Sequence, residues 1–214
     1  MPELSFAVES ARAEPFAAAP LLLFTLRVHQ AAPVVPIHSV VLRCQIRIEP
    51  GKRPYAASEK ERLHDLFDAP DRWRQTLRPM LWTHASVVLP PFTEGVTADL
   101  PAPCTFDFNV AATKYFHALE DGEAPLTFLF SGTVFYEGDD GALQVAQIPW
   151  DREAAFRLPM RTWREMMNRY YPNSAWLCLR QDIFDRLYRY KSRRGLPTWE
   201  QALESLLPDE KGPS

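Results

Sequence analysis

Glycine is scarce in this sequence, and its scarcity excludes several kinds of ligand site. Only 8 of the 214 residues are glycine, whereas 20 are proline. Loops that bind dinucleotides or phosphates need closely spaced glycines, because only a bare backbone approaches the phosphates closely enough. The sequence contains no such loop, and we predict no cofactor. The many prolines predict short secondary-structure elements joined by stiff connections.

Cysteines and long apolar runs are also few. The three cysteines, Cys44, Cys104 and Cys178, are odd in number and widely spaced, which indicates a reducing compartment rather than a disulfide-linked scaffold. The longest apolar run, Ala17–Leu26, is shorter than the roughly 18 residues of a membrane-spanning helix. Acidic rather than basic residues precede that run, unlike the start of a signal peptide. We therefore expect a cytoplasmic protein without a membrane span.

The sequence shows no pattern that is typical of a catalytic or metal site. No two of the five histidines have the spacing of metal ligands on a helix, and there is no Cys-x-x-Cys pair. Ser131-Gly132 lacks the leading glycine of a nucleophile elbow, and Gly132 instead indicates a bulge or a close backbone approach within a strand. Clusters of acidic residues fall in predicted turns, at 120–123 and 139–140. We predict no catalytic residue and no metal site.

Apolar and polar residues alternate with period two through much of the first 150 residues, which predicts half-buried antiparallel strands. The clearest runs are Leu22–Val28 and Val40–Ile48, with Pro33 and Pro36 in a turn between them. Further strands are expected at Leu4–Val8, Trp82–Leu89, Cys104–Val110, Leu126–Tyr136 and Leu143–Ile148. About seven short strands with proline-rich turns favour a β-sandwich over a parallel sheet.

Helical patterns interrupt this β-rich segment and follow it. Ser58 and Glu61 have the spacing of a capping box, which predicts a short helical insert that ends before Pro70. From Pro159 onward the apolar residues are spaced by three and four, as in helices. We expect helices from Pro159 to before Pro172, over Asp182–Arg194 with Gly195 as its end, and over Trp199–Leu207 after a Thr198 cap.

The predicted fold class is therefore α+β. It comprises an antiparallel β-sandwich-like body over residues 1–150, the short helical insert, and a helical C-terminal third over residues 159–207. No internal repeat or low-complexity linker is present, so the sequence predicts a single domain over residues 1–208. The residues from 209 to 214 are expected to form a tail.

Charge is unevenly distributed along the chain. Between Arg152 and Arg194 there are 10 arginines and 1 lysine against 4 acidic residues, a charge of +7, whereas the rest of the chain carries −10. Such segregation indicates a macromolecular partner rather than a particular fold.

Two groups of arginines are candidate partner-binding residues. Alternation places Arg27, Arg43 and Arg47 on one solvent-facing surface if their two strands are neighbours, although pairing with Glu49 or a solubilising role would also explain them. The helix over Asp182–Arg194 carries the second group, although cations near a helix C-terminus also interact favourably with the helix dipole without any ligand. The members of this second group are Arg186, Arg189, Arg193 and Arg194, interleaved with tyrosines.

The six tryptophans are expected mainly in the core and at helix contacts. One or two of them on an exposed rim would be good anchors for an interface. They are Trp73, Trp82, Trp150, Trp163, Trp176 and Trp199.

Five segments of the chain resemble an uncharacterised bacterial family found mainly in actinobacteria. They are 42–50 (LRCQIRIEP), 81–84 (LWTH), 130–135 (FSGTVF), 148–150 (IPW) and 195–199 (GLPTW). The resemblance extends from about Leu4 to Leu207. By this resemblance, the gene is expected to lie near the genes of uptake nickel–iron hydrogenases and of their maturation factors. The resemblance therefore implies hydrogenase assembly or an accessory function by association, and it supplies no catalytic residues.

The sequence as a whole predicts a non-enzymatic accessory protein that binds another protein, with a hydrogenase subunit or maturation factor as the partner. Two alternatives remain open. One is an enzyme or small-ligand module with a pocket built around Cys44, His84 or Cys104. The other is binding of RNA or DNA through the basic helices, which the net charge of −3 and the absence of a known nucleic-acid module disfavour.

Overall fold

A computed structural model describes residues 2–104, 110–174, 177 and 179–207 of the chain. Contacts between residues divide the chain into two compact units, Met1–Pro172 and Asn173–Ser214, and each unit is described by itself. The single domain over residues 1–208 stays a prediction, and the tail expected at 209–214 lies outside the described residues. Within the described part of the chain, no helix has both the length and the apolar character needed to cross a membrane.

Three antiparallel strands form the first sheet of the first unit. They are β1 (Glu3–Ala13), β2 (Leu21–Ala31) and β5 (Gly95–Pro103), in the order β1-β2-β5. In β2, every second residue from Leu22 to Val28 is fully buried, which confirms the predicted alternation. The edge strand β5 was not predicted, and the strand expected at Cys104–Val110 lies mostly outside the described residues. Two prolines, Pro101 and Pro103, fit this edge because an edge strand has no neighbour on one side.

The second sheet is organised around one long strand, β6 (Glu123–Glu137). Its other members are β4 (Met80–Leu89), β3 (Ile37–Ile48), β7 (Leu143–Gln147) and β8 (Glu153–Pro159), with the order β4-β3-β6-β7 and β8 also paired with β6. Strand β8 pairs with residues 123–129 of β6, and β7 pairs with residues 133–137. The segment 148–152, between β7 and β8, faces the gap that these two pairings leave. There the Ile148 amide donates to the Gly132 carbonyl, and the Phe130 amide donates to the Arg152 carbonyl.

The buried faces of the two sheets pack against each other through aromatic rings. The ring of Phe24 in β2 lies 6.2 Å from that of Trp82 in β4 and 4.9 Å from that of Phe128 in β6, edge to face. At another point Phe6 of β1 stacks on Phe130 of β6, with ring centroids 4.4 Å apart. Each such pair stabilises the core by about 0.5–1.5 kcal/mol beyond area burial. The first unit is thus a mixed α/β structure with two antiparallel sheets.

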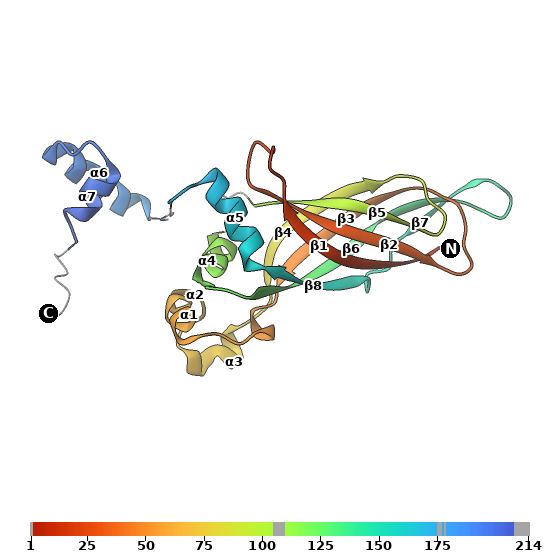
Figure 1. Ribbon diagram of the computed structural model, residues 1–214, viewed down its shortest axis with the longest axis horizontal. Coiled ribbons are helices and arrows are strands. Elements are labelled where there is room, and N and C mark those ends of the chain that lie inside the picture. The colour runs from red at the N-terminus through yellow and green to blue at the C-terminus, as the bar shows by residue number, and fades with distance from the viewer. Residues whose placement is uncertain (1, 105–109, 175–176, 178, 208–214) are drawn as a thin grey trace. The chain divides into compact units, whose positions relative to one another are not determined.

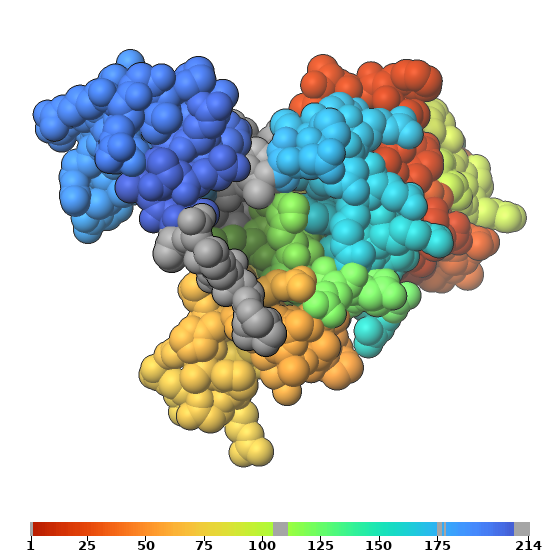
Figure 2. Space-filling view, turned by 60° about the vertical axis from the view of Figure 1, so that its left-hand side comes forward, coloured from red at the N-terminus to blue at the C-terminus, as the bar shows by residue number. Residues whose placement is uncertain are grey.

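Short helices gather at one end of the sheets (Figure 1). They are η1 (Pro50–Lys52), α1 (Ala57–Arg62), α2 (His64–Phe67), η2 (Pro70–Arg72), α3 (Trp73–Thr76), α4 (Val110–Ala118) and α5 (Met160–Tyr170). Figure 2 shows α4 and α5 side by side on this end, and the rings of Phe116 and Trp163 join them at 5.3 Å. The helical insert was predicted, but the predicted capping box of Ser58 and Glu61 was wrong. Glu59, not Glu61, accepts the Ala56 amide proton, because Arg53 holds the Glu59 carboxylate at the helix start.

The second unit contains α6 (Gln181–Arg194) and α7 (Trp199–Glu204). Gly195 adopts the left-handed conformation, with φ of +64°, and ends α6 as predicted. The Thr198 hydroxyl accepts the Gln201 amide proton at 3.2 Å and begins α7, which confirms the predicted cap. Trp199 joins the two helices, since its ring lies 5.3 Å from that of Phe184.

Candidate functional site

Of the residues proposed for a pocket, Cys44 and His84 line one hollow on the second sheet, whereas Cys104 lies apart from them in the first sheet. Cys44 lies opposite Ala85 and is buried, whereas His84 lies opposite Gln45 on the exposed face of the same sheet. Cys104 follows β5 in the other sheet and is buried there. Burial raises the pKa of each of these two thiols to about 12. A thiol with such a pKa stays protonated near neutral pH and is a poor nucleophile or metal ligand.

The arginines of the strands occupy two different sheets. Arg27 lies in β2 of the first sheet, whereas Arg43 and Arg47 lie in β3 of the second. The expectation of one shared surface is wrong, because the connection through Pro33 and Pro36 carries the chain from one sheet to the other instead of closing a hairpin. Arg27 is exposed and pairs with Glu9 at 3.4 Å.

Arg43 and Arg47 project from the outward face of β3. The Arg47 guanidinium donates to the Gln45 side-chain oxygen at 2.9 Å. The suggested pairing with Glu49 is not observed, because the Glu49 carboxylate pairs with Lys52 at 3.6 Å. Across the part of the chain that the structure describes, neither Arg43 nor Arg47 forms an ion pair.

A hollow of about 530 Å³ lies on this outward face of the second sheet. The register of the strands explains why the surface is hollow here. Arg43 of β3 lies between Ser86 of β4 and Ser131 of β6, and the short side chains of these two serines leave space beside it. Gln45 and His84 form the adjoining row. We name this surface the Trp150 hollow and define it by Arg43, Gln45, His84, Ser86, Ser131 and Trp150.

Trp150 itself is 92% exposed, although tryptophan usually packs in a core. Its position is fixed by the segment 148–152, both ends of which are hydrogen-bonded to β6. Within the turn, the Arg152 amide donates to the Pro149 carbonyl at 3.3 Å, and the Arg152 guanidinium pairs with Glu3 at 2.9 Å. Trp150 is therefore a large, exposed ring on a well-anchored turn.

Apolar side chains continue the surface beside the Trp150 hollow. Val41 of β3 and Val88 of β4 are direct neighbours in register on the same face, and both are exposed, Val88 at 65%. The sequence named Trp150 only as one of six tryptophans, one or two of which could anchor an interface, and it did not name these valines for binding. The turn pattern of Pro149 and Asp151 around an aromatic residue was the available signal for Trp150.

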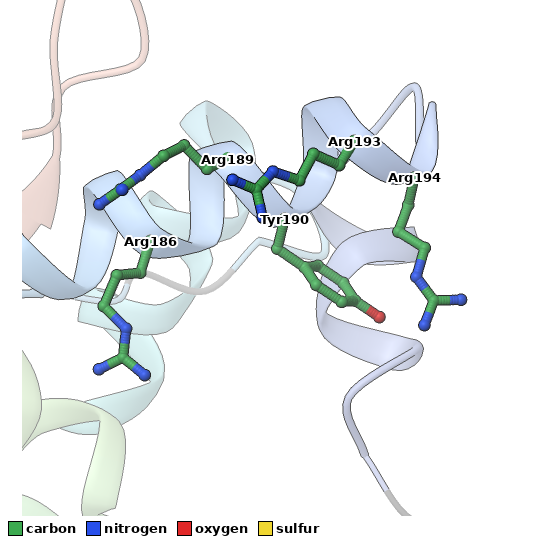
Figure 3. Close-up of a pocket in the computed structure, with 5 residues that line it drawn as sticks. All are labelled: Arg186, Arg189, Tyr190, Arg193 and Arg194. Atoms are coloured by element: carbon green, nitrogen blue, oxygen red, sulfur yellow. The ribbon is translucent and has the colours of Figure 1, made fainter.

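The second candidate surface is the α6 arginine face, defined by Arg186, Arg189, Tyr190, Arg193 and Arg194, which line a hollow of about 490 Å³ (Figure 3). Figure 3 shows the Tyr190 ring between the side chains of Arg186 and Arg194, and the Arg194 guanidinium lies 5.4 Å from the ring centroid. All four arginines are exposed. In the described residues no carboxylate pairs with any of them.

The tyrosine of this face is held by the residues that directly follow α7. The Tyr190 hydroxyl lies 3.0 Å from the Ser205 hydroxyl, and Leu206 contributes with Ile183 and Leu187 to an apolar hollow beside it. Between Arg186 and Arg194 there are five cationic residues and no acidic one. The α6 arginine face thus combines unneutralised guanidinium groups with an adjoining apolar surface.

No group of three or more histidine, cysteine or acidic side chains is arranged to hold a metal ion in the described ranges.

The whole chain, residues 1–214, matches the model of one protein family, whose description is "Family of unknown function (DUF6084)". No curated protein matches the chain. Among solved structures, a β-glucosidase from Kluyveromyces marxianus is 11% identical, with a TM-score of 0.25, over 73% of this chain and 15% of that chain. The putative ApaA protein from Bordetella pertussis is 14% identical, with a TM-score of 0.24, over 73% of this chain and 93% of that chain.

Proposed function

This chain belongs to the family of unknown function DUF6084, and we propose that it is a non-enzymatic accessory factor that binds another protein. The observation that carries this proposal is the α6 arginine face, where four exposed arginines have no acidic partner within the described residues. Arg186, Arg189 and Arg193 follow one another at helical spacings of three and four, so their side chains share one side of the helix.

Guanidinium groups in this arrangement favour a carboxylate-rich partner. The planar guanidinium binds a carboxylate through two parallel hydrogen bonds, which an ammonium group cannot do. An acidic protein surface would also relieve the repulsion between neighbouring arginines, and the apolar side chains next to Tyr190 would be covered at the same time. The helix dipole explains a preference for cations at this end of α6, but it does not explain the adjoining apolar hollow.

The family resemblance supports a particular partner, a subunit or a maturation factor of a nickel–iron hydrogenase, in an actinobacterial cytoplasm. The proposed contact residues are the four arginines of α6 together with Arg43 and Arg47 of the second sheet. Arg27 stays a candidate as well, but its guanidinium is paired with Glu9 and lies in the other sheet.

Co-purification of the full chain from its native host, with chemical crosslinking, tests the proposal. The decisive variant is the triple substitution Arg186→Gln, Arg189→Gln and Arg193→Gln. We expect the recovery of hydrogenase subunits or maturation factors to fall by roughly tenfold or more, which corresponds to about 1.4 kcal/mol. The matched control removes the same charge from exposed arginines of the first unit, Arg72, Arg74 and Arg78, and should leave recovery unchanged.

Two outcomes would contradict the proposal. One is that no hydrogenase-related protein is crosslinked to the unmodified chain. The other is that single-stranded RNA or duplex DNA is retarded by the chain at low salt and released by the triple substitution. That result would assign the α6 arginine face to nucleic acid, whose binding weakens steeply as salt rises.

A further inference from the structure

We infer that the Trp150 hollow binds an acidic segment of a partner protein, with a carboxylate on Arg43 and an apolar side chain on Trp150. The inference rests on the proposed function, protein binding, but it concerns a surface of the first unit that shares no residue with the α6 arginine face. It therefore predicts the chemistry of the bound segment as well as its place.

The surroundings of Arg43 favour a carboxylate ligand. Its neighbours in the two adjoining strands are serines, whose short side chains neither neutralise nor cover the guanidinium. Gln45, the nearest polar residue along the same face of β3, accepts its hydrogen bond from Arg47 instead. The residues that line the hollow include no acidic one. Arg43 is thus a central cation whose countercharge is supplied from outside the hollow.

Trp150 favours an apolar side chain beside that carboxylate. A ring that is 92% exposed gains contact area only when a partner covers it. Because the hydrogen bonds of the 148–152 turn already fix its backbone, little conformational entropy is lost when a partner binds. Exposed tryptophans beside arginines are the residue types that dominate binding energy in protein interfaces.

The neighbouring surface indicates a peptide rather than a nucleic acid. Val41 and Val88 form an apolar strip that continues from Arg43. Apolar side chains form neither hydrogen bonds nor ion pairs with the phosphates of a nucleic acid. Nucleic-acid affinity depends on several phosphates neutralised in series, whereas this hollow contains a single arginine. In an extended segment, alternate side chains point the same way, so an acidic residue two positions from an apolar one reaches both Arg43 and the valines.

Fluorine NMR of the full chain labelled with 5-fluorotryptophan tests this inference. The substitution Trp150→Phe identifies the Trp150 resonance by its loss. The probes are an end-blocked hexapeptide, Gly-Asp-Asp-Phe-Leu-Gly, in which each aspartate lies two positions from an apolar residue, and two counterparts in which asparagine or lysine replaces both aspartates. We expect only the aspartate peptide to shift the Trp150 resonance, and we expect its affinity to fall as salt rises from about 50 mM to about 500 mM.

The substitution Arg43→Gln should weaken binding of the aspartate peptide roughly tenfold, as expected for the loss of one charge-assisted contact. The matched control is Arg12→Gln, which removes an exposed strand arginine from the first sheet and should change nothing. Unshifted resonances of the buried Trp163 and Trp73 in the peptide-free Arg43→Gln protein show that its fold is intact.

Equal shifts by the aspartate and asparagine peptides, or a shift by none of the three, would overturn the inference. A shift by a single-stranded oligonucleotide would overturn it as well and assign the surface to nucleic acid. The triple substitution in α6 separates this inference from the proposed function. It should reduce partner recovery in the crosslinking experiment by roughly tenfold or more, but leave the peptide-induced shift of Trp150 unchanged.

Discussion

A Cβ atom placed on Gly132 would lie 2.1 Å from the carbonyl oxygen of Val41, a distance that no real side chain shows. The two residues belong to the neighbouring strands β6 and β3, and Gly132 has φ of +148°, where side chains are disfavoured. The sequence interpretation of Gly132 as a close backbone approach is confirmed. This contact lies directly beside the Trp150 hollow, since Ser131 lines it and the Gly132 carbonyl accepts from Ile148.

We expect Gly132→Ala to lower the free energy of unfolding by about 1–3 kcal/mol, because the alanine backbone is strained at this φ. The free energy should fall further because β3 has to move away from the new Cβ atom. Urea denaturation followed by circular dichroism measures the loss. The control is Gly51→Ala, where the new Cβ would lie at an ordinary 3.5 Å from the Leu77 carbonyl oxygen and should change stability by less than about 0.5 kcal/mol. Similar losses in the two variants would rule out the contact with Val41 as the cause.

The ion pair between Arg53 and Glu59 is buried, and the Glu59 carboxylate also accepts the amide protons of Ala56 and Glu120. Substituting Glu59→Gln leaves the Arg53 charge buried without its partner, so the free energy of unfolding should fall by about 3–5 kcal/mol. The exposed pair of Glu9 with Arg27 serves as the comparison, because Glu9→Gln should cost at most about 1 kcal/mol. Equal losses in urea denaturation would contradict this ranking.

The pKa of Asp68 is lowered mainly by the hydrogen bond from the Ala69 amide, at 2.8 Å, and further by Arg72. Because the folded pKa lies below the unfolded one, the stabilisation is complete above the unfolded pKa and is lost as pH falls through the folded pKa. Carbon-13 NMR titration of the side-chain carboxyl should show the lowered pKa. Arg72→Gln should raise it only partly, because the amide still donates, while Arg74→Gln should leave it unchanged.

Cys44 and Cys104 should resist thiol reagents in the folded protein, because both are buried and burial raises the pKa of each to about 12. In a Cys178→Ser variant, we expect no rapid reaction with dithiobis-nitrobenzoate at pH 8. Two thiols per chain should react once denaturant is added. Rapid labelling of a thiol without denaturant would show that one of these two side chains is accessible.

Local features of the sequence predicted much of the secondary structure. Alternation in Leu22–Val28 and Val40–Ile48 predicted β2 and β3, because each strand buries one face whatever its neighbours are. Gly195 and Thr198 predicted the junction between α6 and α7, because a helix end depends only on the few residues around it. Glu59 shows the limit of such rules, since the choice between two acidic residues was decided by the more distant Arg53.

The arrangement of the strands depends on contacts that the sequence does not display. Arg27 and Arg43 lie in alternating strands joined by a short proline-containing turn, and this pattern also fits a hairpin. Whether such a turn closes a hairpin or crosses between sheets depends on which strands pair later in the chain. Strand β5 escaped prediction because its prolines are tolerated only at a sheet edge, and edge position is a property of the whole sheet.

The candidate surfaces were predictable to different degrees. The sequence predicted the helix that carries Arg186, Arg189 and Arg193, and the period of a helix puts side chains spaced by three and four on one side of it. The exposure of Trp150 was not predictable in the same way. It results from the division of one side of β6 between β7 and β8, which leaves the 148–152 turn outside the core.

Because β7 and β8 share one side of β6, the length of the turn between them determines which residues of β8 are buried in the core. Both ends of the segment from Ile148 to Arg152 are hydrogen-bonded to β6, so a one-residue deletion would pull β8 along β6 by one position. A slip of one position reverses the two faces of a strand and would turn Phe156 and Leu158 from the core towards solvent. Among relatives, a shorter Trp150 turn is therefore expected only where the apolar positions of β8 have shifted by one residue as well.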